Sequence, residues 1–304
     1  MHLVNLLSGA VALASLISAA CIRDDSTVQV AADTKFLFLF GDSYTRTHFE
    51  VSREKPSSKS PLGNPPWPGL TSAGGKNWVA HTLTERLPKN DTLTFNLAVG
   101  GSTIDRNTIP GNPKSTVTEQ VKLWDDNYKN KPSYAKWSSS NAAVGIWIGI
   151  NDIGATYSKA NTEAVLTKAI DKYFSLLEHF YKAGIRIAFL IKVPPTQRTP
   201  KLKKKGAATV EEVTKAVNFY NKYLAEKAVK WQGHHSDLKV KVVEITEAFN
   251  MALDDPKKYG AKDNTCTHSD GKTCVSQDLP SSRLFHFKSC TDLSIVVMGG
   301  LLPS

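Results

Sequence analysis

Five apolar runs alternate with longer amphipathic stretches, and this alternation constrains the fold more than any other feature of the chain. The runs lie at residues 36–40, 93–98, 143–150, 185–193 and 238–245. Helical spacing is found at residues 77–87, 116–124, 161–182 and 210–231, and a short helix is expected from Thr246. Strands that alternate with helices of about this length form parallel sheets through βαβ units. The pattern predicts a three-layer α/β/α sandwich around a five-stranded parallel sheet, in one domain covering residues 30–304.

The N-terminus carries an apolar segment that is typical of a secretory signal peptide. Residues 3–20 are almost entirely apolar and end in small residues, which favours cleavage after Ala20. A membrane anchor is the alternative, but the stretch is short for a transmembrane span. The first 20 residues are therefore expected to be removed, and the protein is expected to be secreted and extracellular, without stable membrane insertion.

Cysteine and asparagine positions agree with a secreted chain. Of the four cysteines, Cys266 and Cys274 would close a short loop, and a disulfide between them is expected in an oxidising compartment. Free thiols are the alternative reading. Asn90 begins an Asn-x-Thr sequon and is the expected glycosylation site.

The chain has a formal net charge of +10, part of which lies in the basic segment at residues 201–205. This segment is interpreted as a solvated loop that leads into a helix. The alternative is a patch for an anionic polymer. No aromatic residues interleave with the lysines and no nucleic-acid-binding signature is present, so a nucleic-acid partner is not expected.

A serine stands where the first predicted strand stops. The apolar run 36–40 is followed by Gly41, Asp42 and Ser43. Ligands bind at the carboxyl ends of the strands in open α/β sheets, so Ser43 is a candidate nucleophile. An ordinary turn is the alternative, because all three residues are common turn formers.

The next two strand ends carry hydrogen-bond donors that complement a nucleophilic serine. Gly100 and Gly101 follow the second strand, and Asn151 follows the third. Acyl transfer forms a tetrahedral intermediate with a negative oxygen, and each donor aimed at that oxygen contributes about 3–4 kcal/mol. Gly101 can present its backbone N–H and Asn151 its side-chain amide, while the Ser43 N–H would be a third donor. Taken singly, the glycines could form a turn and Asn151 could cap a helix.

With these residues in order, the chain resembles the GDSL, or SGNH, family of esterases and lipases. The matching segments are residues 41–43, 96–103 and 149–152. Residues 61–69, 77–78 and 147–154 further resemble the branch of fungal secreted acetylesterases, which remove acetyl groups from plant-wall sugars. The similarity runs from about residue 36 to about residue 283.

The resemblance implies a flavodoxin-like sandwich that needs no cofactor and no metal. It implies Ser43 as the nucleophile, with Gly101 and Asn151 as oxyanion donors, and an acetylated carbohydrate or another small ester as the substrate. A monomer is expected. Trp67 lies in the loop after the nucleophile, where it could stack on a sugar ring or pack into the core.

The general base is the part of the family pattern that this sequence lacks. The family supplies it from a C-terminal Asp-x-x-His-Pro block, and no Asp-x-x-His occurs in this chain. His286 lies nearest to the expected position, with Arg283 three residues before it in place of aspartate. His286 is therefore the candidate base, because a serine hydroxyl needs a base to take its proton.

Two explanations of the missing block stay open. One is divergence, which would give a non-catalytic or impaired protein that binds sugar esters or a partner on the same fold. The other is a shift of reading frame in the gene sequence near residue 284, which the genomic DNA downstream would reveal. Within the enzyme class, a lipase or acylhydrolase is the alternative to an acetylesterase; no long apolar lid is evident, which favours short acyl groups.

Overall fold

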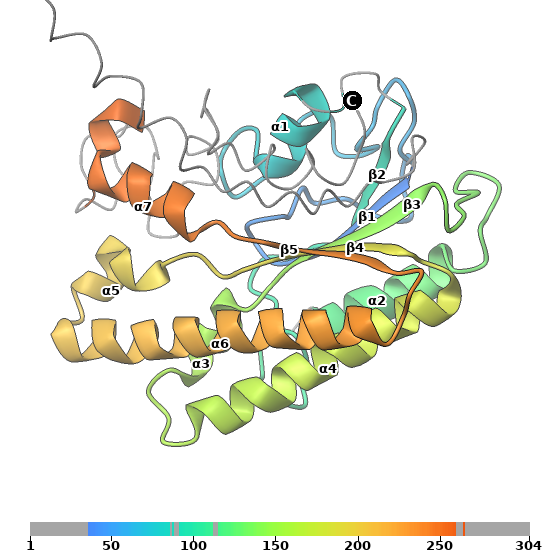
Figure 1. The fold of residues 1–304 in the computed structure, drawn as a ribbon. Coiled ribbons are helices and arrows are strands. Elements are labelled where there is room, and N and C mark those ends of the chain that lie inside the picture. The colour runs from blue at the N-terminus through green and yellow to red at the C-terminus, as the bar shows by residue number, and fades with distance from the viewer. Residues whose placement is uncertain (1–35, 86, 88–90, 112–114, 260–263, 265–304) are drawn as a thin grey trace, which may run out of the picture.

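The computed structural model describes residues 36–85, 87, 91–111, 115–259 and 264. The expected signal segment, Asn90, all four cysteines and His286 lie outside these residues. The described residues form five strands separated by helical segments, with seven α-helices and two short 3₁₀ turns in all (Figure 1). In chain order they are β1 (Phe36–Gly41), α1 (Trp78–Glu85), β2 (Leu93–Asn96), α2 (Val117–Asn127), β3 (Ala142–Trp147), α3 (Ile150–Thr156), α4 (Thr162–Ala183), β4 (Ile187–Ile191), η1 (Thr196–Arg198), α5 (Pro200–Lys203), α6 (Ala207–Gly233), β5 (Lys239–Val243), α7 (Thr246–Asp254) and η2 (Pro256–Tyr259).

The strands form one parallel sheet in the order β2-β1-β3-β4-β5. β1 lies between β2 and β3, with Phe36 opposite both Leu93 and Ala142. All five carboxyl ends therefore lie along one edge. The chain places β2 on one side of β1 and β3, β4 and β5 on the other, so the strand order reverses at β1. In doubly wound sheets, ligands bind at such a switch point. This confirms the predicted five-stranded parallel sheet and its flavodoxin-like arrangement.

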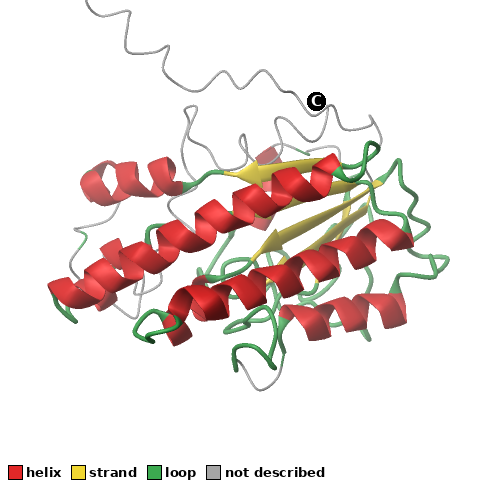
Figure 2. Ribbon diagram, turned by 60° about the horizontal axis from the view of Figure 1, so that its bottom comes forward, coloured by secondary structure: helices red, strands yellow, loops and turns green. Residues whose placement is uncertain are grey.

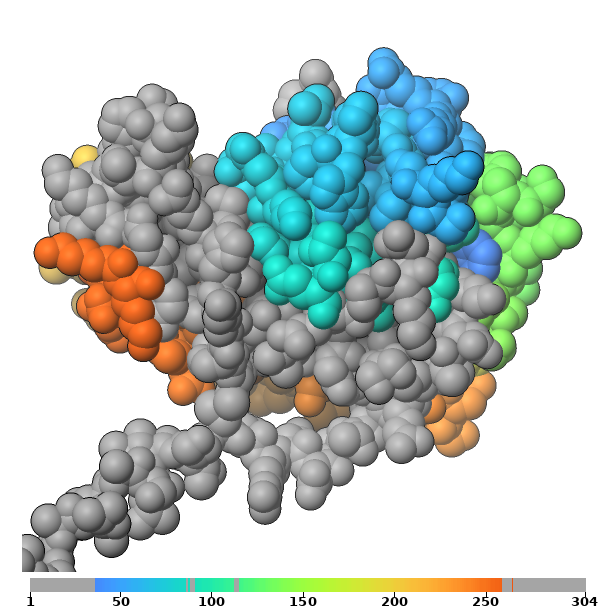
Figure 3. Space-filling model, turned by 90° about the horizontal axis from the view of Figure 1, so that it is seen from above, coloured from blue at the N-terminus to red at the C-terminus, as the bar shows by residue number. Residues whose placement is uncertain are grey.

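Helices cover both faces of the sheet, which gives the three predicted layers (Figures 1 and 2). α2, α4 and α6 pack on one face, and α1 and α7 pack on the other. Seen from above, the loop after β1, in blue, lies beside α1, in cyan, on the second face (Figure 3). Among the described helices, none is both long enough and apolar enough to span a membrane.

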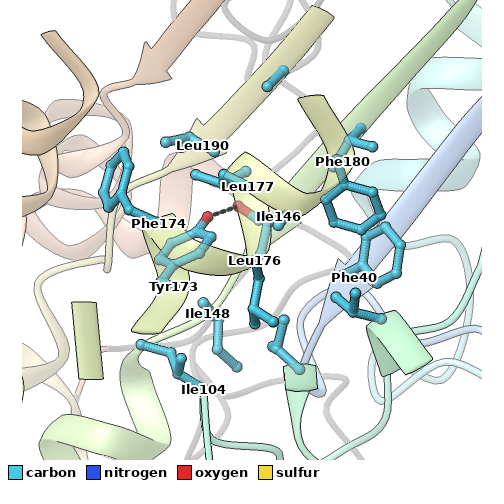
Figure 4. Packing of buried hydrophobic residues seen from close by; sticks show 14 of the residues in the cluster. Phe40, Ile104, Ile146, Ile148, Tyr173, Phe174, Leu176, Leu177, Phe180 and Leu190 are labelled. Atoms are coloured by element: carbon cyan, nitrogen blue, oxygen red, sulfur yellow. Dashed lines mark hydrogen bonds between the residues drawn. The ribbon is translucent and has the colours of Figure 1, made fainter. Parts of the chain in front are cut away.

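The apolar residues of β1 serve both faces of the sheet. Phe38 and Phe40 point to the larger cluster under α2, α4 and α6, while Leu37 and Leu39 point to the cluster under α1 and α7. Figure 4 shows Phe40 packed against Phe180 of α4, with ring centroids 5.0 Å apart. A strand that is buried on both faces has no polar alternation, which explains the uninterrupted apolar run in the sequence.

Most predicted boundaries differ from the observed ones by one to three residues, and two differences change the type of element assigned. The third strand was expected to reach residue 150, but β3 ends at Trp147 and α3 begins at Ile150. Apolar residues in short runs suit a strand or a buried helix equally, so periodicity does not mark this boundary. The basic segment was expected to be a loop; residues 200–203 form the short helix α5, and Lys201, Lys203, Lys204 and Lys205 are exposed.

Candidate active site

Ser43 lies on a tight turn that follows β1 directly. The N–H groups of Thr45 and Arg46 both donate to the Asp42 carbonyl, at 3.1 and 3.0 Å, so the segment forms one helical turn. The buried Asp42 carboxylate accepts a hydrogen bond from the Tyr44 N–H at 3.0 Å. Ser43 itself is half-buried. The strand and the turn together fix the backbone that carries the Ser43 hydroxyl.

Two asparagines hold the far side of this turn. Asn77, just before α1, donates its amide to the Thr45 carbonyl at 3.1 Å. Asn96, at the end of β2, donates to the same carbonyl at 2.6 Å. Both amides are buried. The turn that carries Ser43 is therefore tied to two other elements, which restricts its movement.

Gln120 of α2 joins the end of β1 to the loop after β2. Its Oε1 accepts from the Gly41 N–H at 2.9 Å, and its Nε2 donates to the Gly41 carbonyl at 2.8 Å. The same Nε2 lies 3.1 Å from the Ser102 hydroxyl. One buried amide thus fixes the residues just before Ser43 relative to the residue just after Gly101.

Asn151 and Asp152 tie the third strand end to the same loop. The Asn151 Nδ2 donates to the Ser102 carbonyl at 2.8 Å. The Asp152 Oδ1 accepts from the Ile104 N–H at 3.0 Å, and this side chain is completely buried. Hydrogen bonds through Gln120 and Ser102 therefore link the three segments that carry Ser43, Gly101 and Asn151 at the carboxyl edge of the sheet.

Three N–H groups are available to a ligand at this place. Within the described residues, no hydrogen bond uses the backbone N–H of Ser43 or that of Gly101. Gly101 is exposed, with φ at +78°. The Asn151 amide uses one N–H for Ser102 and has a second one left. Fixed donors that converge beside a hydroxyl can stabilise an oxygen that becomes negative during acyl transfer.

Sequence reasoning missed the bridging role of Gln120. The side chains of Val117, Gln120, Val121 and Trp124 form the buried face of α2. The sequence does contain a signal for this role: Gln120 interrupts an apolar stripe with i, i+3, i+4 spacing. A glutamine there is expected to be buried, and a buried amide must find hydrogen-bond partners.

Three of the described histidines pair with acidic side chains, and the other two are exposed. His81 is buried, with its Nδ1 2.8 Å from Glu85. His179 pairs with Asp125 at 2.7 Å and His235 with Glu178 at 2.8 Å. His48 and His234 are exposed. No histidine among the described residues hydrogen bonds to Ser43, and the candidate base His286 lies outside them.

Trp67 is 41% exposed, so its ring is not part of the core. It belongs to the Pro-rich loop between β1 and α1, which has no regular secondary structure. The structure therefore fits a Trp67 ring that is free to stack on a sugar rather than one packed into the core. Within the part of the chain that the structure describes, no group of three or more His, Cys, Asp or Glu side chains is placed to hold a metal ion.

Asp152 makes the stability of this site depend on pH. Burial raises the pKa of Asp152 from its ordinary 3.8 to about 7, against the opposing hydrogen bond from Ile104. Within the described residues, its Oδ2 has no hydrogen-bond partner. Folding therefore takes up a proton between these two pH values, and the free energy of unfolding falls as the pH rises from about 4 to about 7. The size of this contribution is about 4 kcal/mol.

We expect Asp152→Asn to remove this pH dependence. Urea unfolding of both proteins at pH 4, 5.5 and 7 measures it. The variant should gain stability relative to the parent as the pH rises, by up to about 4 kcal/mol at pH 7. Equal pH profiles for the two proteins would show that Asp152 does not titrate in this range.

Known proteins are similar to this chain in sequence and in fold. An acetylesterase from Thermothelomyces thermophilus is 38% identical over 245 residues, which cover 80% of this chain and 81% of that protein. An acetylesterase from Hypocrea jecorina is 26% identical over 167 residues, which cover 51% of this chain and 46% of that protein.

Among solved structures, a variant of Axe2, an acetyl-xylooligosaccharide esterase from Geobacillus Stearmophilus, superimposes with a TM-score of 0.51 at 14% identity. The match covers 91% of this chain and 100% of that one and shows a common fold. The family described as GDSL-like lipase/acylhydrolase matches residues 37–276, a range that ends before His286. This match, together with the 38% identity to the Thermothelomyces acetylesterase, shows that the chain belongs to the GDSL-like lipase/acylhydrolase family of carboxylic ester hydrolases.

Proposed function

We propose that this protein is a secreted serine esterase that removes acetyl groups from carbohydrate esters through an acyl-enzyme on Ser43. The observation that carries the proposal is the convergence of Ser43, Gly101 and Asn151, linked through Ser102 and Gln120. The two related proteins that are named acetylesterases support the acetyl group as the acyl part. The exposed Trp67 supports a sugar as the alcohol part, since an aromatic face can stack on a sugar ring.

The proposed reaction has two halves. In the first, the Ser43 Oγ attacks the acetyl carbon while a base takes the hydroxyl proton, and the carbonyl oxygen becomes negative. The N–H groups of Ser43, Gly101 and Asn151 hold that oxygen. The C–O bond to the sugar then breaks, the base returns the proton to the leaving alcohol, and acetyl-Ser43 remains. In the second half, water attacks this ester and releases acetate. We assign the base to His286.

Labelling with a fluorophosphonate and an acyl-chain series test this proposal together. We expect the full chain to gain one phosphonyl group, located on Ser43 by peptide mass spectrometry. It should hydrolyse 4-nitrophenyl acetate faster than the butyrate or octanoate, and it should release acetate from acetylated xylo-oligosaccharides. A faster rate on octanoate would indicate a lipase. No labelling and no turnover would favour a binding protein on the same fold.

Removing the Asn151 amide should slow the chemical step. We expect Asn151→Ala to lower kcat on 4-nitrophenyl acetate by about 100-fold with little change in KM, because the amide helps the oxyanion more than the ground state. Asn127→Ala is the matched control. The Asn127 amide also donates to a backbone carbonyl, that of Leu123 at 2.8 Å, but it lies at the C-terminal end of α2, one turn or more beyond Gln120. If the two variants have equal kcat, Asn151 is not an oxyanion donor.

We base secretion on the apolar segment at residues 3–20. Protein recovered from the culture medium of a eukaryotic host should begin at Cys21 when its N-terminus is sequenced. A cell-associated chain that still begins at Met1 would contradict secretion without affecting the esterase proposal.

A further inference from the structure

Arg46 places a positive charge beside the proposed oxyanion donors. Residues 42–46 form one helical turn, so the side chains of Ser43 and Arg46 leave the same side of it, with Cβ atoms about 5–6 Å apart. The guanidinium reaches the loop after β2. An added Cβ on Gly100 would lie 3.1 Å from the Arg46 Nη1 and 3.3 Å from its Cζ. Gly100 is the direct neighbour of Gly101, so the cation lies at the rim of the site.

The charge of Arg46 is not neutralised by the described part of the protein. Its Nη2 donates to the exposed Ser72 hydroxyl at 3.1 Å, and its buried Nε has no hydrogen-bond partner among the described residues. No carboxylate of the described residues lies within ion-pair distance of its guanidinium; Glu50, the nearest acidic residue along the chain on its C-terminal side, pairs with Arg53 at 2.7 Å. Burial lowers the pKa of Arg46 and removes water from it. A partly desolvated guanidinium without a counter-ion favours binding of an anionic group.

We propose that Arg46 is a specificity-determining residue that binds a carboxylate on the alcohol part of the substrate, as in an acetylated sugar acid. The inference rests on the proposed esterase function. A guanidinium matches a carboxylate through two parallel N–H donors, and such charge-assisted pairs are stronger than neutral hydrogen bonds. The Nη2 group that contacts Ser72 lies at an exposed position, so a substrate can reach it. The net charge of +10 would also attract an acidic substrate.

The test uses two acetyl esters, 3-acetoxybenzoate and its methyl ester, in which a methyl ester replaces the negative carboxylate; release of the acetyl group is followed for both. The measured quantity is the ratio of kcat/KM for the charged ester to that for the neutral ester. Arg46→Gln should lower this ratio by about 10-fold. Arg46→Lys should lower it less, because lysine keeps the positive charge but lacks the two parallel N–H donors of the guanidinium. Rising salt should lower the ratio in the parent protein. The matched control is Arg53→Gln, which should keep the parent ratio. An unchanged ratio in Arg46→Gln would overturn the inference.

A binding measurement separates this inference from the esterase proposal. The dissociation constants of 3-hydroxybenzoate and methyl 3-hydroxybenzoate are measured by calorimetry on the full chain, on Arg46→Gln and on Arg53→Gln, with circular dichroism to confirm folding. Weaker binding of the acid to Arg46→Gln alone, by about 10-fold, supports the carboxylate site even if neither ester is hydrolysed. Equal binding of the acid to all three proteins would overturn the carboxylate site at Arg46, even if the esters are hydrolysed.

Discussion

Ser43→Ala is expected to lower kcat/KM for 4-nitrophenyl acetate by about 10⁴-fold or more, because no acyl-enzyme can form without the hydroxyl. The turn at residues 42–46 is held by backbone bonds and by Asn77 and Asn96, none of which uses the Ser43 side chain. The variant should therefore fold like the parent and lose only the chemistry. Initial rates and thermal unfolding of both proteins measure the two effects.

Ser175→Ala is the matched control for this change. Ser175 is exposed on α4, and its hydroxyl donates to the Lys172 carbonyl within the helix. Its replacement should leave the rate at the parent value. If Ser43→Ala hydrolyses the ester as fast as the parent does, the turnover does not pass through Ser43 and the acyl-enzyme mechanism is wrong.

Gly41→Ala should destabilise the protein more than any other single methyl addition near the site. Gly41 has φ at +142°, and an added Cβ would lie 2.1 Å from the backbone oxygen of Trp147 in the adjacent strand β3. Backbone atoms of a central strand cannot move away without breaking the pairing. The strained φ and the overlap together should lower the free energy of unfolding by about 4 kcal/mol. Urea unfolding, monitored by tryptophan fluorescence, measures this loss.

Gly154→Ala is the matched control for the added methyl group. Gly154 lies within α3 and is exposed, and no atom of the described residues lies within 4 Å of an added Cβ. Alanine is the better helix former, so this variant should be more stable by about 0.5–1 kcal/mol. Equal stabilities of the Gly41 and Gly154 variants would contradict the packing at the end of β1.

The sheet could be predicted from the sequence because its central strands β1, β3 and β4 are buried on both faces. Phe36 to Phe40 must be apolar on both sides of β1, which leaves a continuous run that few other structures explain. The end of β3 could not be predicted in the same way. Ile148 and Ile153 are buried beyond the strand, so the apolar pattern continues through Gly149, where φ of +124° turns the chain into α3.

The parts of the candidate site that local sequence governs were the predictable ones. Ser43, Gly101 and Asn151 each follow a strand, and parallel strands place their carboxyl ends along one edge. Local sequence also sets the helical turn at residues 42–46. His286 stays a prediction, since it lies outside the described residues and beyond the family match.

The contacts that position these residues were decided only by the tertiary structure. Gln120 contacts Gly41 across 79 positions of the chain, and Asp152 contacts Ile104 across 48. Arg46 lies against Gly100 because β1 and β2 are neighbours in the sheet. The sequence by itself determined which residues stand at the strand ends, because hydrophobic periodicity is a local property. Which polar groups meet there depends on how strands and helices pack, because a hydrogen bond or an unpaired charge is defined by its surroundings in space.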